Sequence, residues 1–213
     1  MSIPAMRERL RNACGVEQGE AFFARAVVLV EGETEQAALP QYAAAMNVDF
    51  DALGISIVTA GGKAGLGTLY QLYDGLGFPV FLLFDNDIGG NATDIHLNRV
   101  LTRLLELLET DRPEPDVTPR YAVLEPDFEG TVRAEVGAEI YDELKAQAAA
   151  EFGAKAGKPI VGRFIARKLT ERGIIPPTIR KVIEASQEMV TPIPAVLEFT
   201  EPGELDLDDE IPF

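Results

Sequence analysis

Short apolar runs alternate with helical patterns over the first 130 residues, and this alternation constrains the fold more than any other feature. Runs of five or six apolar residues are typical of parallel strands that helices cover on both faces. The pattern predicts an α/β fold with a parallel sheet of about four strands flanked by helices, followed by a C-terminal helical region. The predicted strands are 26–30, 54–59, 79–84 and 120–124.

The helical patterns predict how the rest of the chain is organised. Helices are expected over 34–46, with a kink at Pro40, over 66–76 and over about 94–108, and 110–119 is expected to be a loop. From about residue 131 the pattern is helical, with breaks near Gly153 and Gly173. The predicted divisions are an N-terminal linker or helix at 1–25, an α/β core at 26–130, a helical subdomain with a basic surface at 131–200 and an acidic tail at 201–213.

The charge and the scarcity of cysteine and histidine exclude several classes of protein. With 19 basic and 35 acidic residues the formal net charge is −16, which excludes a protein that coats nucleic acid by its bulk charge. The single Cys14 excludes a disulfide framework and a cysteine-rich zinc site, and His96 is interpreted as a surface or packing residue. A metal site in this chain would therefore be built from oxygen ligands.

The sequence also predicts the cellular localisation of the protein. Its N-terminal residues lack the apolar segment of a secretion signal, and apolar runs such as 26–30 are far shorter than the ~20 residues of a membrane span. We therefore expect a cytoplasmic protein with no membrane partner.

Acidic residues follow three of the four predicted strands at the point where each strand ends. Because the carboxyl ends of parallel strands meet at one edge of a sheet, these side chains are expected to lie together. The acidic pairs, in chain order, are Glu31 and Glu35, Asp85 and Asp87, and Asp127 and Glu129.

Six carboxylates at one edge require a compensating cation, because like charges at ~4 Å repel by several kcal/mol near a protein surface. Six are more than one Mg²⁺ usually takes from a protein, whereas two Mg²⁺ or Mn²⁺ ions ~3.5–4 Å apart would suit phosphodiester hydrolysis. The alternative is that acids such as Glu33, Glu35 and Asp94 only favour helix starts and loops.

The motifs VEGETE at 30–35 and DND at 85–87 resemble the Toprim fold. Together with FFARAVVLVEGETEQAALP, LLFDNDIGGN and LEPDFEG, they are most similar to the nuclease half of the overcoming-lysogenization-defect (OLD) family, over about 22–130. The resemblance implies a metal-dependent DNA endonuclease or exonuclease that follows an ATPase domain and in some members acts beside a helicase. It also implies that Glu31 and Glu35 match the ExxxE ligands, Asp85 and Asp87 the DxD ligands, and Asp127 and Glu129 the additional acids.

A basic stretch at 155–181 stands out from the acidic background and is predicted to contact DNA phosphates, or else to be a solvated face that balances the acids. GKP at 157–159 is similar to a lysine-bearing segment of OLD nucleases, which assigns Lys158 a catalytic role beside Glu31, namely to neutralise charge developing on the phosphate. The predicted DNA-binding residues are Arg163, Arg167, Lys168 and Lys63, and Lys63 is also the second choice for the catalytic lysine.

The glycine-rich loop around Lys63 is not an ATP site. A Walker A motif would need glycine at 57 and serine or threonine at 64, where the chain has Ile57 and Ala64. We therefore expect no ATP site in this chain. The same loop is a candidate to approach a DNA phosphate with its backbone amides, or else is simply a turn into a helix.

Two other functions remain open from the sequence. Recombination-mediator proteins use a Toprim domain as a scaffold, which would make the acids a partner-binding surface, and a topoisomerase or primase half is a third interpretation. The final residues, DLDDEIPF, are similar to the tip of bacterial single-stranded-DNA-binding proteins. They are either a docking segment for a repair partner or an acidic terminus.

Overall fold

A parallel sheet forms the centre of the protein in the computed structural model, which describes residues 15–88, 90 and 92–190. Within these residues five strands pair in the order β2-β1-β3-β5-β4. All neighbouring strands are parallel except β4, which runs antiparallel to β5. This arrangement confirms the predicted α/β fold. The strands are β1 (Ala26–Val30), β2 (Ile55–Thr59), β3 (Val80–Asp85), β4 (Asp116–Val117) and β5 (Tyr121–Leu124).

The edge strand β4 is the main difference from the predicted sheet. It lies in the segment predicted to be a loop, and it pairs through Asp116 with Val123 and through Val117 with Ala122. A strand of two residues is too short to show an alternating pattern, and Pro115 directly before it favours a loop in the sequence.

The predicted helices are present with shifted ends: the one predicted over about 94–108 ends at Leu104, and the short helix Phe50–Leu53 has no counterpart in the predicted pattern. The helix predicted at 66–76 begins three residues earlier, at Lys63, and the helix predicted at 34–46 runs through Pro40 without a break. Among the described residues no helix is long and apolar enough to cross a membrane. The helical segments are α2 (Val16–Glu20), a short 3-10 turn η1 (Ala21–Phe23), α3 (Glu33–Ala45), α4 (Phe50–Leu53), α5 (Lys63–Gly75), α6 (Ala92–Leu104), α7 (Phe128–Val136), α8 (Ala138–Phe152), α9 (Lys158–Glu171) and α10 (Pro177–Glu188).

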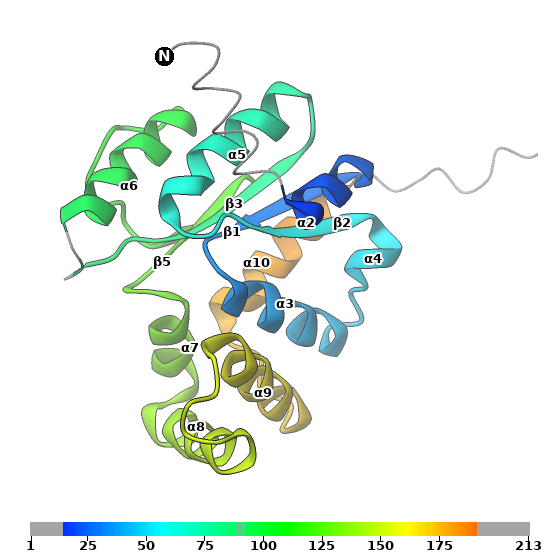
Figure 1. Ribbon diagram of the computed structural model, residues 1–213, viewed down its shortest axis with the longest axis vertical. Helices are drawn as coiled ribbons and strands as arrows, with labels where there is room; N and C mark the ends of the chain where they lie inside the picture. The colour runs from blue at the N-terminus through cyan, green and yellow to red at the C-terminus, as the bar shows by residue number, and fades with distance from the viewer. Residues whose placement is uncertain (1–14, 89, 91, 191–213) are drawn as a thin grey trace, which may run out of the picture.

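Helices cover both faces of the sheet, as continuous apolar strands require. On one face Val27, Leu29 and Leu82 pack against α5 and α6, and on the other Val28 and Leu83 pack against α3 and α10 (Figure 1). Successive residues of each strand therefore point to opposite faces of the sheet and pack against different helical layers.

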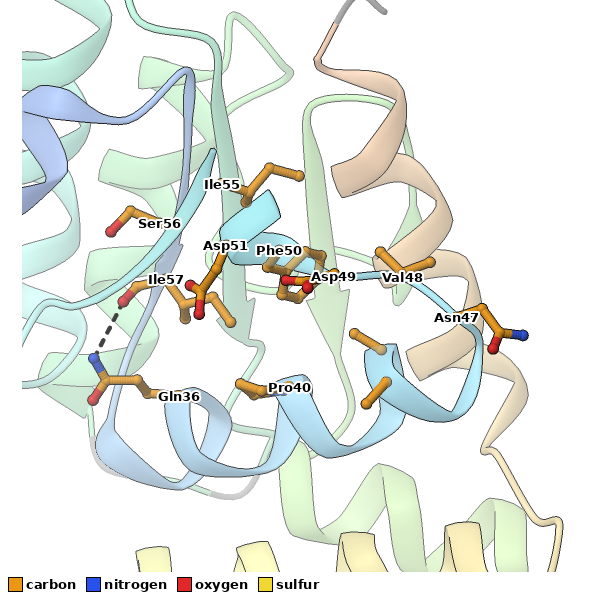
Figure 2. Close-up of a pocket in the computed structure, with 12 residues that line it drawn as sticks. Gln36, Pro40, Asn47, Val48, Asp49, Phe50, Asp51, Ile55, Ser56 and Ile57 are labelled. Carbon is orange, nitrogen blue, oxygen red and sulfur yellow. Dashed lines mark hydrogen bonds between the residues drawn. The ribbon is translucent and has the colours of Figure 1, made fainter. Parts of the chain in front are cut away.

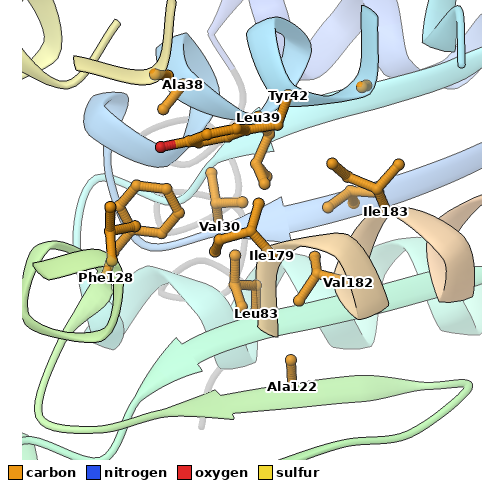
Figure 3. Close-up of a cluster of buried hydrophobic side chains, with 14 of the residues drawn as sticks. Val30, Ala38, Leu39, Tyr42, Leu83, Ala122, Phe128, Ile179, Val182 and Ile183 are labelled. Carbon is orange, nitrogen blue, oxygen red and sulfur yellow. The ribbon is translucent and has the colours of Figure 1, made fainter. Parts of the chain in front are cut away.

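The C-terminal helices serve two purposes. α10 returns to the sheet and places Ile179, Val182 and Ile183 in the same apolar cluster as Val30 and Leu83 (Figure 3). In contrast, α7, α8 and α9 extend from the sheet as a separate group of helices, and α9 packs along α3 (Figure 1). The region after residue 131 thus completes the core and also places α9 beside the end of β1.

The close packing of α9 on α3 depends on Gly162. A Cβ atom at this position would lie 2.6 Å from Thr34 Cγ2, which is closer than real contacts. Lys158 is one turn before Gly162 in the same helix, so this contact also determines where Lys158 lies.

We expect Gly162→Ala to destabilise the protein by about 1–3 kcal/mol, because overpacking outweighs the gain in helix propensity. The matched control is Gly75→Ala, since Gly75 is also helical but a Cβ atom there would meet no other atom within 4 Å. Thermal melts should show a lower melting temperature for Gly162→Ala and an equal or higher one for Gly75→Ala. Equal melting temperatures for both variants would contradict the tight crossing of α3 and α9.

Candidate functional site

The three acidic pairs come together at the carboxyl edge of the sheet. Because β3 lies between β1 and β5, its last residue, Asp85, is at the centre of the cluster. The backbone N–H of Asp85 donates to Glu31 Oε1 at 2.9 Å, and that of Asp87 donates to the Pro126 carbonyl at 3.2 Å. These bonds tie the ends of β1 and β5 to the end of β3. We call the six side chains the carboxylate cluster: Glu31, Glu35, Asp85, Asp87, Asp127 and Glu129.

Glu35 lies in the first turn of α3 and is 6% exposed. Burial raises its pKa to about 7, and the neighbouring charges of Glu31 and Glu129 act in the same direction while Lys158 opposes them. Glu35 is therefore close to acids from both β1 and α7, as well as to the start of α9.

Asp85 is the most strongly affected member of the carboxylate cluster. Burial is the main cause that raises its pKa to about 9, followed by the charges of Glu31, Glu35 and Asp127. Burial is also the main cause that raises the pKa of Glu31. The charge of Lys63 opposes both shifts but does not cancel them.

Asp127 and Glu129 add the third part of the cluster. Asp127 caps α7, because its Oδ1 accepts from the backbone N–H of Gly130 at 2.6 Å. Glu129 Oε1 lies 3.4 Å from Lys158 Nζ. Asp127 thus combines the helix-capping role with a place in the cluster, and its cap also explains why α7 begins before the predicted residue 131.

Lys158 is at the start of α9, directly before Pro159, and its side chain is 83% exposed. A cavity of about 470 Å³ opens beside it between α7, α8 and α9, and its lining includes Asp127, Glu129 and Tyr141. Lys158 therefore faces the open side of the carboxylate cluster, where a negatively charged ligand could approach.

Lys63 has a different environment from the one expected for a DNA contact. Its side chain is only 2% exposed, and its ammonium forms ion pairs with Asp87 and, at 3.6 Å, with Glu31. The structure therefore brings Lys63 into the carboxylate cluster and turns its charge away from the surface.

The other predicted DNA-binding residues lie on α9. Arg163 is exposed. Arg167 and Lys168 approach Glu171 at 3.8 and 2.7 Å and lie over the Phe164 ring. Glu171 therefore offsets part of the basic charge of this helix.

Two buried asparagines support the site, and the sequence reasoning missed both. Asn98 donates to the Asn86 carbonyl at 2.8 Å and accepts from Lys63 Nζ at 2.9 Å, while Asn86 donates to Glu125 Oε2 at 3.0 Å. Asn86 could have been found, because a polar residue between the two aspartates of DND follows an apolar strand. Nothing in the pattern of α6 distinguishes Asn98.

His96 is exposed, as interpreted from the sequence, whereas Cys14 and the DLDDEIPF segment lie outside the described residues. A larger cavity, of about 770 Å³, lies between α3, α4 and the edge strand β2 and is lined by Pro40, Phe50 and Ile57 among others (Figure 2). No member of the carboxylate cluster lines this cavity.

The carboxylate cluster fits divalent metal ions by its chemistry. All of its donors are oxygen atoms, which select Mg²⁺ or Mn²⁺. Burial raises the pKa values of Glu31, Glu35 and Asp85, so their ionised forms are disfavoured until a further cation binds. Among the residues that the structure describes, no three acidic or histidine side chains already surround a point as ligands would. Between Glu31 and Asp87 the space is taken by the Lys63 ammonium.

The raised pKa values predict that the metal-free protein loses stability as the pH rises. The folded state holds protons on Glu35 and Asp85 that the unfolded chain has already released, so the free energy of unfolding falls from about pH 4 to about pH 9. Glu35 alone accounts for about 3 kcal/mol. Urea titrations in EDTA at several pH values measure this loss, and Glu35→Gln should flatten the profile. Stability that stays constant or rises would contradict the burial of these acids.

A family model matches the segment of the chain that holds four of the six acids of the carboxylate cluster. Residues 22–87 match the family described as overcoming lysogenization defect protein-like, TOPRIM domain. This match includes the ExxxE segment with Glu31 and the DxD segment with Asp85. A comparison with curated protein sequences finds no match.

Solved structures show the same fold over most of the chain. The C-terminal region of the OLD protein from Xanthomonas campestris pv. campestris, phased with platinum, matches with a TM-score of 0.53 and 23% identity, covering 81% of this chain and 96% of that one. The C-terminal region of the Burkholderia pseudomallei OLD protein matches with a TM-score of 0.54 and 24% identity, covering 80% of this chain and 100% of that one. The likeness extends the shared fold well beyond residue 87.

Proposed function

We propose that this chain, whose residues 22–87 form an OLD-like Toprim domain, is the DNA-cleaving part of a metal-dependent nuclease. The observation that carries the proposal is the meeting of acids from the ends of β1, β3 and β5 around Asp85, with Lys158 on their open side. A buried group of like charges is costly to fold, so its presence favours a function that uses the charge.

The six acids of the carboxylate cluster would hold two Mg²⁺ or Mn²⁺ ions. When bound, the ions would activate the attacking water and stabilise the leaving oxygen of a phosphodiester. Asp85 would sit between the two groups of ligands, because it is close to Glu31 on one side and to Asp127 on the other.

The basic residues would place the DNA. The exposed Lys158 ammonium would contact the reacting phosphate and neutralise the charge that develops there. Arg163, Arg167 and Lys168 would contact neighbouring phosphates along α9, which positions the backbone without reading sequence.

A cleavage assay tests this function. Supercoiled plasmid and end-labelled linear DNA are incubated with the protein and Mg²⁺ or Mn²⁺, so that nicking and end degradation are both seen. The wild type should cleave, Glu31→Gln should lose at least about a hundredfold, and the matched control Glu33→Gln, altered at an exposed residue in the same segment, should keep its activity. DNA binding without metal-dependent cleavage would overturn the nuclease and favour a scaffold of the recombination-mediator type.

We also propose that the chain works as part of a longer protein with an ATPase domain, because the structures it resembles are C-terminal regions of OLD proteins. A helicase is a candidate partner, because some OLD-family members act beside one. This chain by itself should cleave DNA without ATP. If cleavage by the isolated chain required ATP, the assignment of cleavage to this chain and of ATP hydrolysis to another domain would be wrong.

A further inference from the structure

Lys63 is held in one position by the loop that precedes it. Gly61 and Gly62 have φ values of 66° and 113°, which side chains rarely adopt, and the N–H of Gly62 donates to the Glu31 carbonyl at 2.8 Å. A Cβ atom at Gly65 would overlap the Ala60 carbonyl oxygen, so the first turn of α5 packs directly on the end of β2. The glycines therefore allow α5 to begin at Lys63, beside the carboxylate cluster.

All three N–H groups of the Lys63 ammonium have acceptors. They are the Asp85 carbonyl, the Asp87 carboxylate and Asn98 Oδ1, and Glu31 Oε1 lies at 3.6 Å. An ammonium has three donors and no acceptor, so none is left for a phosphate. With its side chain 2% exposed, Lys63 is placed to act on the carboxylates alone.

We propose that Lys63 is a resident counter-ion of the metal site: its ammonium pairs with Glu31 and Asp87 in the metal-free protein, and a divalent ion that binds these two carboxylates must displace it. The inference rests on the proposed nuclease function, because it concerns the same ligands. Both cations seek the same oxygen atoms, and two cations at ~4 Å repel each other. Lys63 thus stabilises the fold before metal binds and weakens the affinity for the metal.

The variant Lys63→Met tests the proposal in two ways, with Lys181→Met as the control because Lys181 is exposed. In EDTA, thermal melts should show a clear loss of stability for Lys63→Met alone, because Glu31 and Asp87 lose their partner. In calorimetric titrations with Mn²⁺, Lys63→Met should bind at least about tenfold more tightly than the wild type. Unchanged or weaker Mn²⁺ binding by a folded Lys63→Met protein would overturn the proposal.

A measurement on the wild type covers the case in which Lys63→Met does not fold. The buried, hydrogen-bonded ammonium of Lys63 should give a slowly exchanging ¹⁵N signal, assigned by its absence from Lys63→Arg, and saturating Mg²⁺ should shift or remove it. A signal that stays unchanged at saturation would overturn the displacement. If the wild type binds no divalent ion at all, the nuclease function fails first, whereas ion binding without these effects refutes the role of Lys63 alone.

Discussion

Asp85→Asn is expected to abolish DNA cleavage, by about a thousandfold or more, while stabilising the metal-free protein. The loss follows because Asp85 is close to Glu31, Glu35 and Asp127 and would be shared by both groups of metal ligands. The gain follows because burial and three like charges raise the pKa of Asp85 to about 9, so an acid at this position destabilises the folded state at pH 7. A stabilisation of about 1–3 kcal/mol is expected in EDTA.

The two measurements together separate a metal ligand from a residue that only supports the fold. A structural residue would lose activity and stability together, whereas Asp85→Asn should lose one and gain the other. The matched control is Asp74→Asn, an exposed aspartate in α5, which should change neither. Retained cleavage by Asp85→Asn would place the reaction elsewhere or reveal a contaminating nuclease.

Lys158→Met is expected to lower kcat by about a hundredfold with little change in the melting temperature. The side chain is 83% exposed and its ion pair with Glu129 spans 3.4 Å, so little stability depends on it. Its catalytic effect is larger because removing one group that stabilises transition-state charge typically costs about 10²–10³ in rate. Steady-state cleavage of a labelled oligonucleotide measures kcat and KM separately.

Lys155→Met provides the matched control, since Lys155 is exposed in the loop just before α9. Loss of a phosphate contact there should alter KM at most, and the effect should diminish at high salt. If both substitutions changed kcat equally, Lys158 would only attract DNA by its charge and would have no specific role in the reaction.

The fold and the meeting of the acids at one edge of the sheet are both predictable from the sequence. The strand Ala26–Val30 is predicted with its observed bounds. Five consecutive apolar residues between two charged residues are typical of a short buried strand. Glu31, Asp85 and Asp127 each follow the end of a predicted strand. Because the carboxyl ends of parallel strands meet at one edge of the sheet, the sequence already places these three acids together.

The rest depends on tertiary contacts that leave little local signal. β4 exists because a two-residue segment pairs with β5, and two residues are too few to form a hydrophobic pattern that predicts a strand. Lys63 follows two glycines, which suggests a phosphate loop. The direction of its side chain is nevertheless determined by Asn98 in α6 and by Asp87 in the segment after β3. Likewise, the packing of α9 on α3 through Gly162 cannot be predicted from either helix alone.

Crystals of the wild type soaked with Mn²⁺ would show whether the carboxylate cluster is a two-metal site, because anomalous scattering locates the ions without reference to activity. We expect two strong anomalous peaks among the carboxylates of Glu31, Glu35, Asp85, Asp87, Asp127 and Glu129. Saturated crystals of a protein that cleaves DNA, with no peak among these residues, would contradict the proposed metal site.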